Sequence, residues 1–187
     1  MKTLKFLALI GLLCILGAVG AAVFFFGGFY SVAGTAAEPK FVDWAMIQTR
    51  QASIARHAKD RAPANLGDAE FIKEGARAYT KRGCVHCHGA PGVEWSKFSE
   101  GLRPDPPDLH EIVDNREPRE LFWVIKNGIK MTGMPSFGAI EVPDQEIWSI
   151  VAFIKKLPTV KDEDYKAWTE EPASPVTGTT TPPAGNP

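Results

Sequence analysis

The chain begins with an uninterrupted apolar segment, whereas its later parts mix apolar and polar positions. After Lys2 and Lys5 no charged residue occurs before Glu38, and residues 6–26 are almost entirely Leu, Ile, Ala, Val, Gly and Phe. A helix rises about 1.5 Å per residue, so about 20 such residues cross the apolar core of a bilayer. We therefore predict a transmembrane helix and its exit over residues 1–37.

This segment has two interpretations, a signal anchor and a cleaved signal peptide. The apolar core of a signal peptide is about 7–15 residues long and ends at small residues. The run here is longer, which favours an anchor, although residues 35–37 (Thr-Ala-Ala) resemble a weak cleavage site. Lys2 and Lys5 precede the run, so we expect a single-pass protein of the cytoplasmic membrane with everything after Tyr30 in the periplasm or outside the cell.

Residues 38–67 have the pattern of an amphipathic stalk. Apolar side chains recur near one face of a helix expected over about residues 41–59, namely Phe41, Trp44, Ile47, Ile54 and Ala58. The far end of this helix is basic, and Pro63 begins the segment that breaks it. A helix packed loosely on the next domain and a helix bound to phospholipid both fit; we favour the first.

Residues 68–158 are expected to form the compact unit. Helices are predicted at 69–82, 118–127 and 144–157, each followed directly by glycine or proline. Residues 89–108 are rich in Gly, Pro and charge and predict a loop, and no strand pattern is apparent. The fold class is therefore all-α. Residues 159–187 are predicted to be a disordered tail, because Pro, Thr, Gly, Ser and Ala dominate its end and cannot bury a core.

The clearest chemistry lies in the sequence CVHCH at residues 84–88, the C-x-x-C-H pattern of c-type haem attachment. Two thiols one helical turn apart suit thioethers to one edge of a porphyrin, and the following histidine suits its iron. A structural zinc site needs four ligands, and the third cysteine, Cys14, lies in the apolar segment. We predict one covalent haem c at Cys84, Cys87 and His88.

The second axial ligand is expected from a downstream loop that contains Met131 and Met134. Cytochromes c commonly use methionine for this position. Met134 precedes Pro135, which lacks an amide donor and restricts the residue before it. Gly133 and Gly138 are expected to let the loop approach the porphyrin. We predict Met134 as the second iron ligand and Met131 as core filler.

Residues 68–158 resemble a class I cytochrome c, particularly the short c-haem domains of cbb-type oxidase subunits. The resemblance is carried by Gly75, Tyr79, the haem motif, residues 106–109 (Pro-Pro-Asp-Leu), residues 128–138 and Trp148. It implies three to five helices around one haem, with the first and last helices crossing at Gly75 beside an aromatic contact that Tyr79 and Trp148 supply. It also implies that the carbonyl of Pro106 or Pro107 accepts a hydrogen bond from the ligating histidine.

These features predict an electron carrier, not an enzyme. Iron with both axial positions filled leaves no site for a substrate, so the chemistry is single-electron transfer. We expect donor and acceptor proteins of a respiratory chain or a dehydrogenase, and lipid around the N-terminal helix. The alternatives are a subunit bound permanently to a membrane oxidoreductase or oxidase complex, and a haem-based sensor, for which no output domain is visible. The net charge of -1 gives no basic field for nucleic acid.

Overall fold

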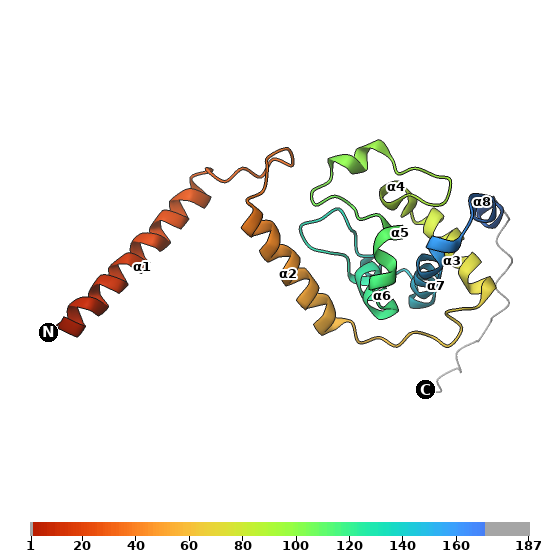
Figure 1. Cartoon of the computed structure of the whole chain (residues 1–187), viewed down its shortest axis with the longest axis horizontal. Coiled ribbons are helices and arrows are strands. Elements are labelled where there is room, and N and C mark those ends of the chain that lie inside the picture. The colour runs from red at the N-terminus through yellow and green to blue at the C-terminus, as the bar shows by residue number, and fades with distance from the viewer. Residues whose placement is uncertain (1, 171–187) are drawn as a thin grey trace, which may run out of the picture. The chain divides into compact units, whose positions relative to one another are not determined.

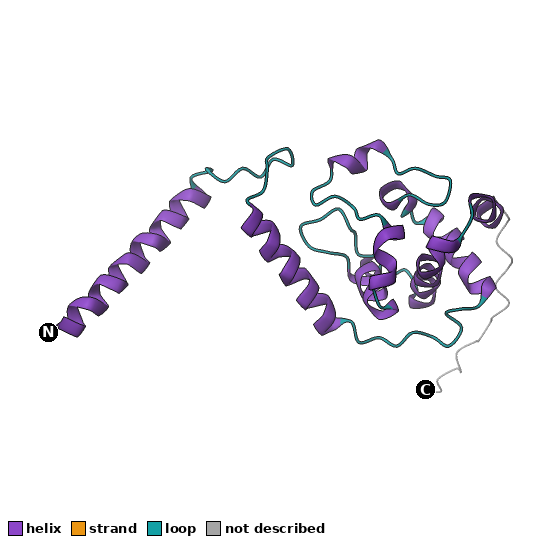
Figure 2. Ribbon diagram, viewed as in Figure 1, coloured by secondary structure: helices purple, strands orange, loops and turns teal. Residues whose placement is uncertain are grey.

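The computed structural model describes residues 2–170 of the chain. Contacts divide it into two compact units, the first ending at Pro39 and the second beginning at Lys40. The described residues form eight α-helices, joined by loops and short 3-10 turns, and no strand. Figures 1 and 2 show how these helices are arranged along the chain. The all-α prediction is confirmed.

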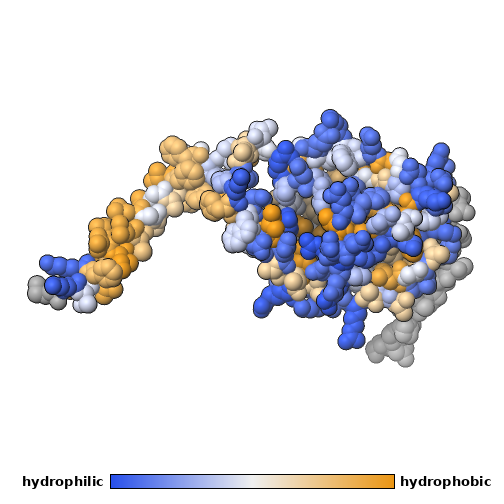
Figure 3. All heavy atoms as spheres, viewed as in Figure 1, coloured by the Kyte–Doolittle hydropathy of each residue, from blue (hydrophilic) through white to orange (hydrophobic). Residues whose placement is uncertain are grey.

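The first unit is dominated by α1 (Lys2–Phe26), which matches the predicted apolar segment. All of its described side chains are exposed, and Figure 3 shows apolar residues along its length. It is the one helix of the described chain that is long and apolar enough to cross a membrane. A membrane span and a signal sequence share these properties, so both interpretations stand.

The second unit is built on the packing of α3 (Ala69–Lys81) against α7 (Asp144–Lys156). The two helices meet at Gly75, where an added Cβ would lie 1.9 Å from the carbonyl oxygen of Ser149. Beside this contact, the rings of Tyr79 and Phe153 meet edge to face with centroids 5.2 Å apart. The crossing at a glycine with an aromatic neighbour is therefore present.

The remaining helices complete the core around this pair. Between α3 and α7 in the chain lie α4 (Val85–His88), α5 (Leu109–Ile112) and α6 (Pro118–Asn127). Trp148 of α7 stacks on Phe122 of α6, with centroids 4.1 Å apart and planes at 11°. The resemblance had placed Trp148 at the crossing of the first and last helices. The structure corrects this, because Phe153 is the α7 residue on the Gly75 side.

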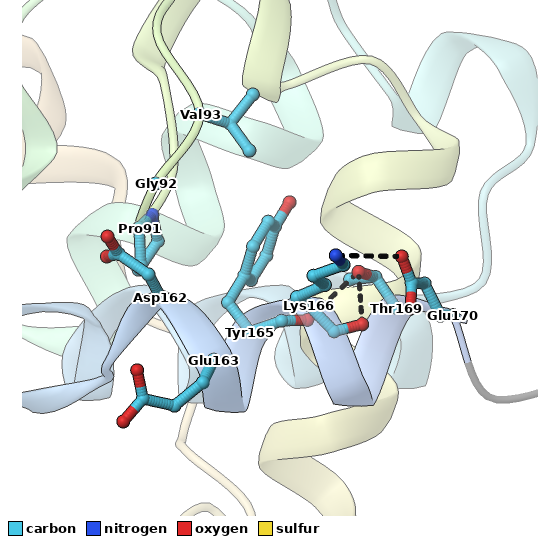
Figure 4. A pocket seen from close by; sticks show the side chains of 9 residues that line it. All are labelled: Pro91, Gly92, Val93, Asp162, Glu163, Tyr165, Lys166, Thr169 and Glu170. Atoms are coloured by element: carbon cyan, nitrogen blue, oxygen red, sulfur yellow. Dashed lines mark hydrogen bonds and ion pairs between the residues drawn. The ribbon is translucent and has the colours of Figure 1, made fainter.

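The structure also corrects the predicted tail, because α8 (Asp162–Glu170) is folded onto the core. Tyr165 is buried, stacks on Phe153 and shares a 2.6 Å hydrogen bond with Thr80. Figure 4 shows the Tyr165 ring pointing from α8 toward Val93. This aromatic burial is the physical reason that the segment folds; the rest of the predicted tail, 171–187, lies outside the described residues.

The predicted stalk helix is α2 (Lys40–His57), and it belongs to the second unit. Ile54 and the following Ala58 are buried. Phe41 and Trp44, which we expected on the same face, are exposed. Helix α2 contacts α6, and the contact includes the ring of His57, at the end of α2, stacked on Trp123.

Candidate haem-binding site

The C-x-x-C-H motif forms a single helical turn directly after α3. Gly83 adopts a positive φ of 78° and turns the chain, and the amide of Cys84 then donates to the carbonyl of Tyr79 at 3.1 Å. The amide of His88 donates to the carbonyl of Cys84 at 3.0 Å. Cys84 and Cys87 are half-buried free thiols, and burial raises the pKa of Cys84 to about 12. The two thiols and the imidazole are therefore presented from one turn.

His88 is held by the backbone of the proline-rich segment. Its Nδ1–H donates to the carbonyl oxygen of Pro107 at 2.9 Å, which decides between the two prolines that the resemblance left open. Burial lowers the pKa of His88, although this hydrogen bond and the Asp108 carboxylate oppose the shift. A neutral imidazole with a proton on Nδ1 has its lone pair on Nε2, the arrangement that a metal ligand requires.

One supporting contact was missed from the sequence. The hydroxyl of the fully buried Tyr79 donates to the carbonyl oxygen of Gly89 at 2.8 Å. Gly89 follows His88 directly and has a positive φ of 65°. The hydrogen bond therefore fixes the backbone where it leaves the motif. The position of Tyr79 on the apolar face of α3 was visible in the sequence, but its polar partner was not.

The loop after α6 holds Met134 in a defined backbone conformation. The amide of Met134 donates to the Thr132 hydroxyl at 3.1 Å, and its carbonyl accepts from the amide of Ile129 at 3.2 Å. Its side chain is half-buried and packs against the core. Met131, in contrast, is 83 % exposed and has a positive φ of 60°. Met131 is thus a surface residue and not the core filler that we expected.

The two glycines of this loop are in contact with protein atoms. A Cβ added to Gly138 would lie 2.8 Å from the carbonyl oxygen of Lys126, at the end of α6. A Cβ added to Gly133 would lie 2.8 Å from the Leu102 side chain. We expected both glycines to make room for a porphyrin. The structure shows that both also allow close packing of the loop, on α6 and on the segment before α5, and the approach to a porphyrin stays a prediction.

The residues present fit a covalently attached haem c. The motif offers two free thiols and a histidine whose tautomer is set by Pro107. Cys84, directly before α4, and Met134, from the loop after α6, pack against the same hydrophobic core. No group of three or more His, Cys, Asp or Glu side chains that would hold a metal ion occurs within residues 2–170.

Comparison with known proteins gives one match. The family model described as "Cytochrome C oxidase, cbb3-type, subunit III" matches residues 70–154, which run from α3 nearly to the end of α7. No curated protein and no solved structure matches the chain significantly. The matched residues contain the C-x-x-C-H motif, Pro107 and Met134.

Proposed function

We propose that this chain is a membrane-anchored carrier of single electrons, because residues 70–154 match the family model described as "Cytochrome C oxidase, cbb3-type, subunit III". Cys84 and Cys87 would hold one haem c through thioethers, and His88 and Met134 would bind its iron. The observation that carries this proposal is the C-x-x-C-H turn with its histidine hydrogen-bonded to Pro107.

Each residue of the site has a distinct task. A bound haem c supplies reversible one-electron chemistry at its iron. Pro107 orients the His88 ring and makes Nε2 a more basic ligand. Met134 offers a soft, neutral thioether, which favours the reduced state. Tyr79 holds the backbone after the motif and so keeps the thiols and the imidazole in one geometry.

We place the haem domain on the outer side of the cytoplasmic membrane. The support is α1, whose length and apolar composition suit a bilayer, and the two lysines that precede most of it. Covalent haem attachment at such motifs follows export, so this orientation and the motif agree. The donor and acceptor are proteins in or at the membrane.

A second candidate is a permanent subunit of a membrane oxidase complex. The description of the matched family, which names an oxidase subunit, favours it. The haem chemistry is the same in both cases, and the lifetime of the contact with the partner differs. Purification from native membranes in mild detergent separates them, because a permanent subunit co-elutes with its complex in constant proportion whereas a free carrier does not.

The haem proposal is tested by extraction. Haem should stay on the chain in acid acetone and after denaturing electrophoresis. Cys84→Ser and Cys87→Ser should lose most of it, whereas Cys14→Ser, in α1, should retain a full complement. Extraction of the haem from the wild-type chain would refute covalent attachment.

A further inference from the structure

Helix α2 is attached to the haem domain by its C-terminal half. Ile54 and Ala58 are 6 % and 1 % exposed, and the His57 ring stacks on Trp123 of α6 with centroids 6.0 Å apart. The helix is therefore part of the folded domain and moves with it.

The N-terminal half of α2 carries two large aromatic side chains that nothing in the second unit covers. Phe41 is 73 % exposed and Trp44 is 64 % exposed. They are three residues apart and so are neighbours on the helix surface. Tryptophan is enriched where a bilayer meets water, because its ring combines an apolar body with a polar N–H.

Helix α2 and the four residues after it carry an excess of positive charge. Residues 40–61 contain five Lys or Arg and two Asp, in a chain whose net charge is -1. The basic residues are Lys40, Arg50, Arg56, Lys59 and Arg61. Lys40, Arg50 and Arg56 lie on α2, and the other two follow its end. A helix that carries both aromatic side chains and cations is typical of those that lie on anionic membranes.

The chain itself brings this helix to the bilayer. Only residues 27–39 separate the end of α1 from the start of α2, and a segment of that length extends over at most about 45 Å. Phe41 and Trp44 lie at the end of α2 that continues directly from this connection. The exposed aromatic pair is thus tethered near the headgroups of any membrane that α1 spans.

The composition of the exposed face favours lipid over a protein partner. Beyond Phe41 and Trp44 it continues with small or polar exposed residues, namely Gln48, Gln51, Ala52 and Ala55. Two aromatic side chains bury too little area for a stable protein interface, which requires about 800 Å² per partner. A bilayer needs no such area, because α1 already supplies the anchoring.

We propose that the exposed face of α2, centred on Phe41 and Trp44, inserts into the headgroup region of an anionic phospholipid bilayer and fixes the orientation of the haem domain there. This inference rests on the proposed function in one respect, which is that α1 stays on the mature chain.

The test uses the full, haem-loaded chain in phosphatidylcholine vesicles that contain phosphatidylglycerol. Single cysteines replace Phe41, Trp44 or, as the control, Lys166 on α8, all in a Cys14→Ser background. Each carries a nitroxide label, whose collisions with oxygen and with a water-soluble nickel complex are measured. The labels at 41 and 44 should collide several-fold less with nickel than the label at 166, and more with oxygen. Equal accessibility at all three sites would overturn the proposal.

Further arms separate the other outcomes. Replacing Arg56, Lys59 and Arg61 by Gln should reduce the protection of a label at 41 in anionic vesicles, whereas Lys166→Gln should leave it unchanged. Protection that appears in native membranes but is absent in pure lipid would assign the face to a protein and overturn the lipid proposal. The mass of the mature chain shows whether α1 is retained. If it is cleaved, the anchor fails, and flotation of the mature chain with anionic vesicles still decides whether the α2 face binds lipid.

Discussion

The Cα of Gly75 lies so close to Ser149 that a Cβ built on it would stand 1.9 Å from the serine carbonyl oxygen. Backbone thus meets backbone where α3 crosses α7. The close approach also brings Tyr79 of α3 into edge-to-face contact with Phe153 of α7. The hydroxyl of the same Tyr79 donates to the carbonyl of Gly89, so one side chain joins the helix crossing to the backbone that follows the C-x-x-C-H motif.

Gly75→Ala should destabilise the domain strongly. The added methyl group meets a backbone carbonyl, which cannot move aside as a side chain can, so we expect a loss of about 3 kcal/mol, at the upper end for overpacking. Denaturant unfolding of the haem-loaded chain measures this. Gly67→Ala is the matched control, since an added Cβ there meets nothing within 4 Å. Equal midpoints for the two variants would contradict the crossing.

Tyr79→Phe should cost about 1–3 kcal/mol, because it leaves the buried Gly89 carbonyl without its donor. The aromatic contact with Phe153 is retained, so the loss reports the hydrogen bond. Tyr30→Phe, which removes a hydroxyl that donates to Glu38 in the first unit, should leave the unfolding of the haem domain unchanged. A Tyr79→Phe chain as stable as the wild type would show that Gly89 finds another donor.

Met134→Ala should remove the second axial ligand. The charge-transfer band of ferric iron bound to methionine should disappear, the potential should fall, and the reduced form should bind carbon monoxide. Met131→Ala should keep the band, because the Met131 side chain is exposed whereas that of Met134 packs against the core. The reverse result would assign the ligand to Met131, and absence of the band from the wild type would revive the sensor alternative.

Glu146 should make the stability of the domain sensitive to acid. Its carboxylate accepts from Nε of Arg82 at 2.7 Å and from a second guanidinium nitrogen at 3.0 Å, which lowers the pKa of Glu146. The pKa of Glu146 is lower in the folded chain than in the unfolded chain, where it is about 4.5, so the ion pair stabilises the fold at pH values above about 4.5. This stabilisation is lost as the pH falls through the folded-state pKa. Denaturant midpoints are measured from about pH 6 to about pH 3, a range that includes the usual pKa of a glutamate. They should fall more steeply with decreasing pH for the wild type than for Glu146→Gln. Glu163→Gln, on the exposed surface of α8, should follow the wild type.

The orientation of the chain gives a further prediction. Protease added to intact spheroplasts should remove the haem domain and leave α1 in the membrane. If the protease cleaves the haem domain only after the membrane has been disrupted, the domain lies in the cytoplasm. A mature chain that starts near Glu38 would instead show that α1 is a cleaved signal.

The sequence was informative wherever a single residue type determines the local structure. Gly83, Gly128 and Pro158 mark the ends of three helices within a residue or two, because glycine and proline limit helices through their own backbones. The choice between Pro106 and Pro107 was not accessible, since both offer the same carbonyl and only the path of the chain selects one.

Two larger differences come from tertiary contacts. Helix α8 follows a helix that ends at a proline and contains few apolar residues, so we predicted a tail there. In the structure, α8 packs on the core because Tyr165 stacks on the Phe153 ring and shares a hydrogen bond with the Thr80 hydroxyl. Helix α2 shows one apolar pattern in sequence, yet the domain covers only its later half. Periodicity reports which side chains share a face but not how much of that face a neighbour covers.

Because α2 is packed on the haem domain, the connection to α1 is limited to residues 27–39. A flexible segment of that length has a root-mean-square span of about 20 Å, compared with about 35 Å if the chain were flexible as far as α3. The volume that the domain explores falls with roughly the cube of this span. If α1 anchors the chain as proposed, the buried half of α2 raises the local concentration of the haem domain for partners in the same membrane. It also shortens the distance over which the domain can reach other partners.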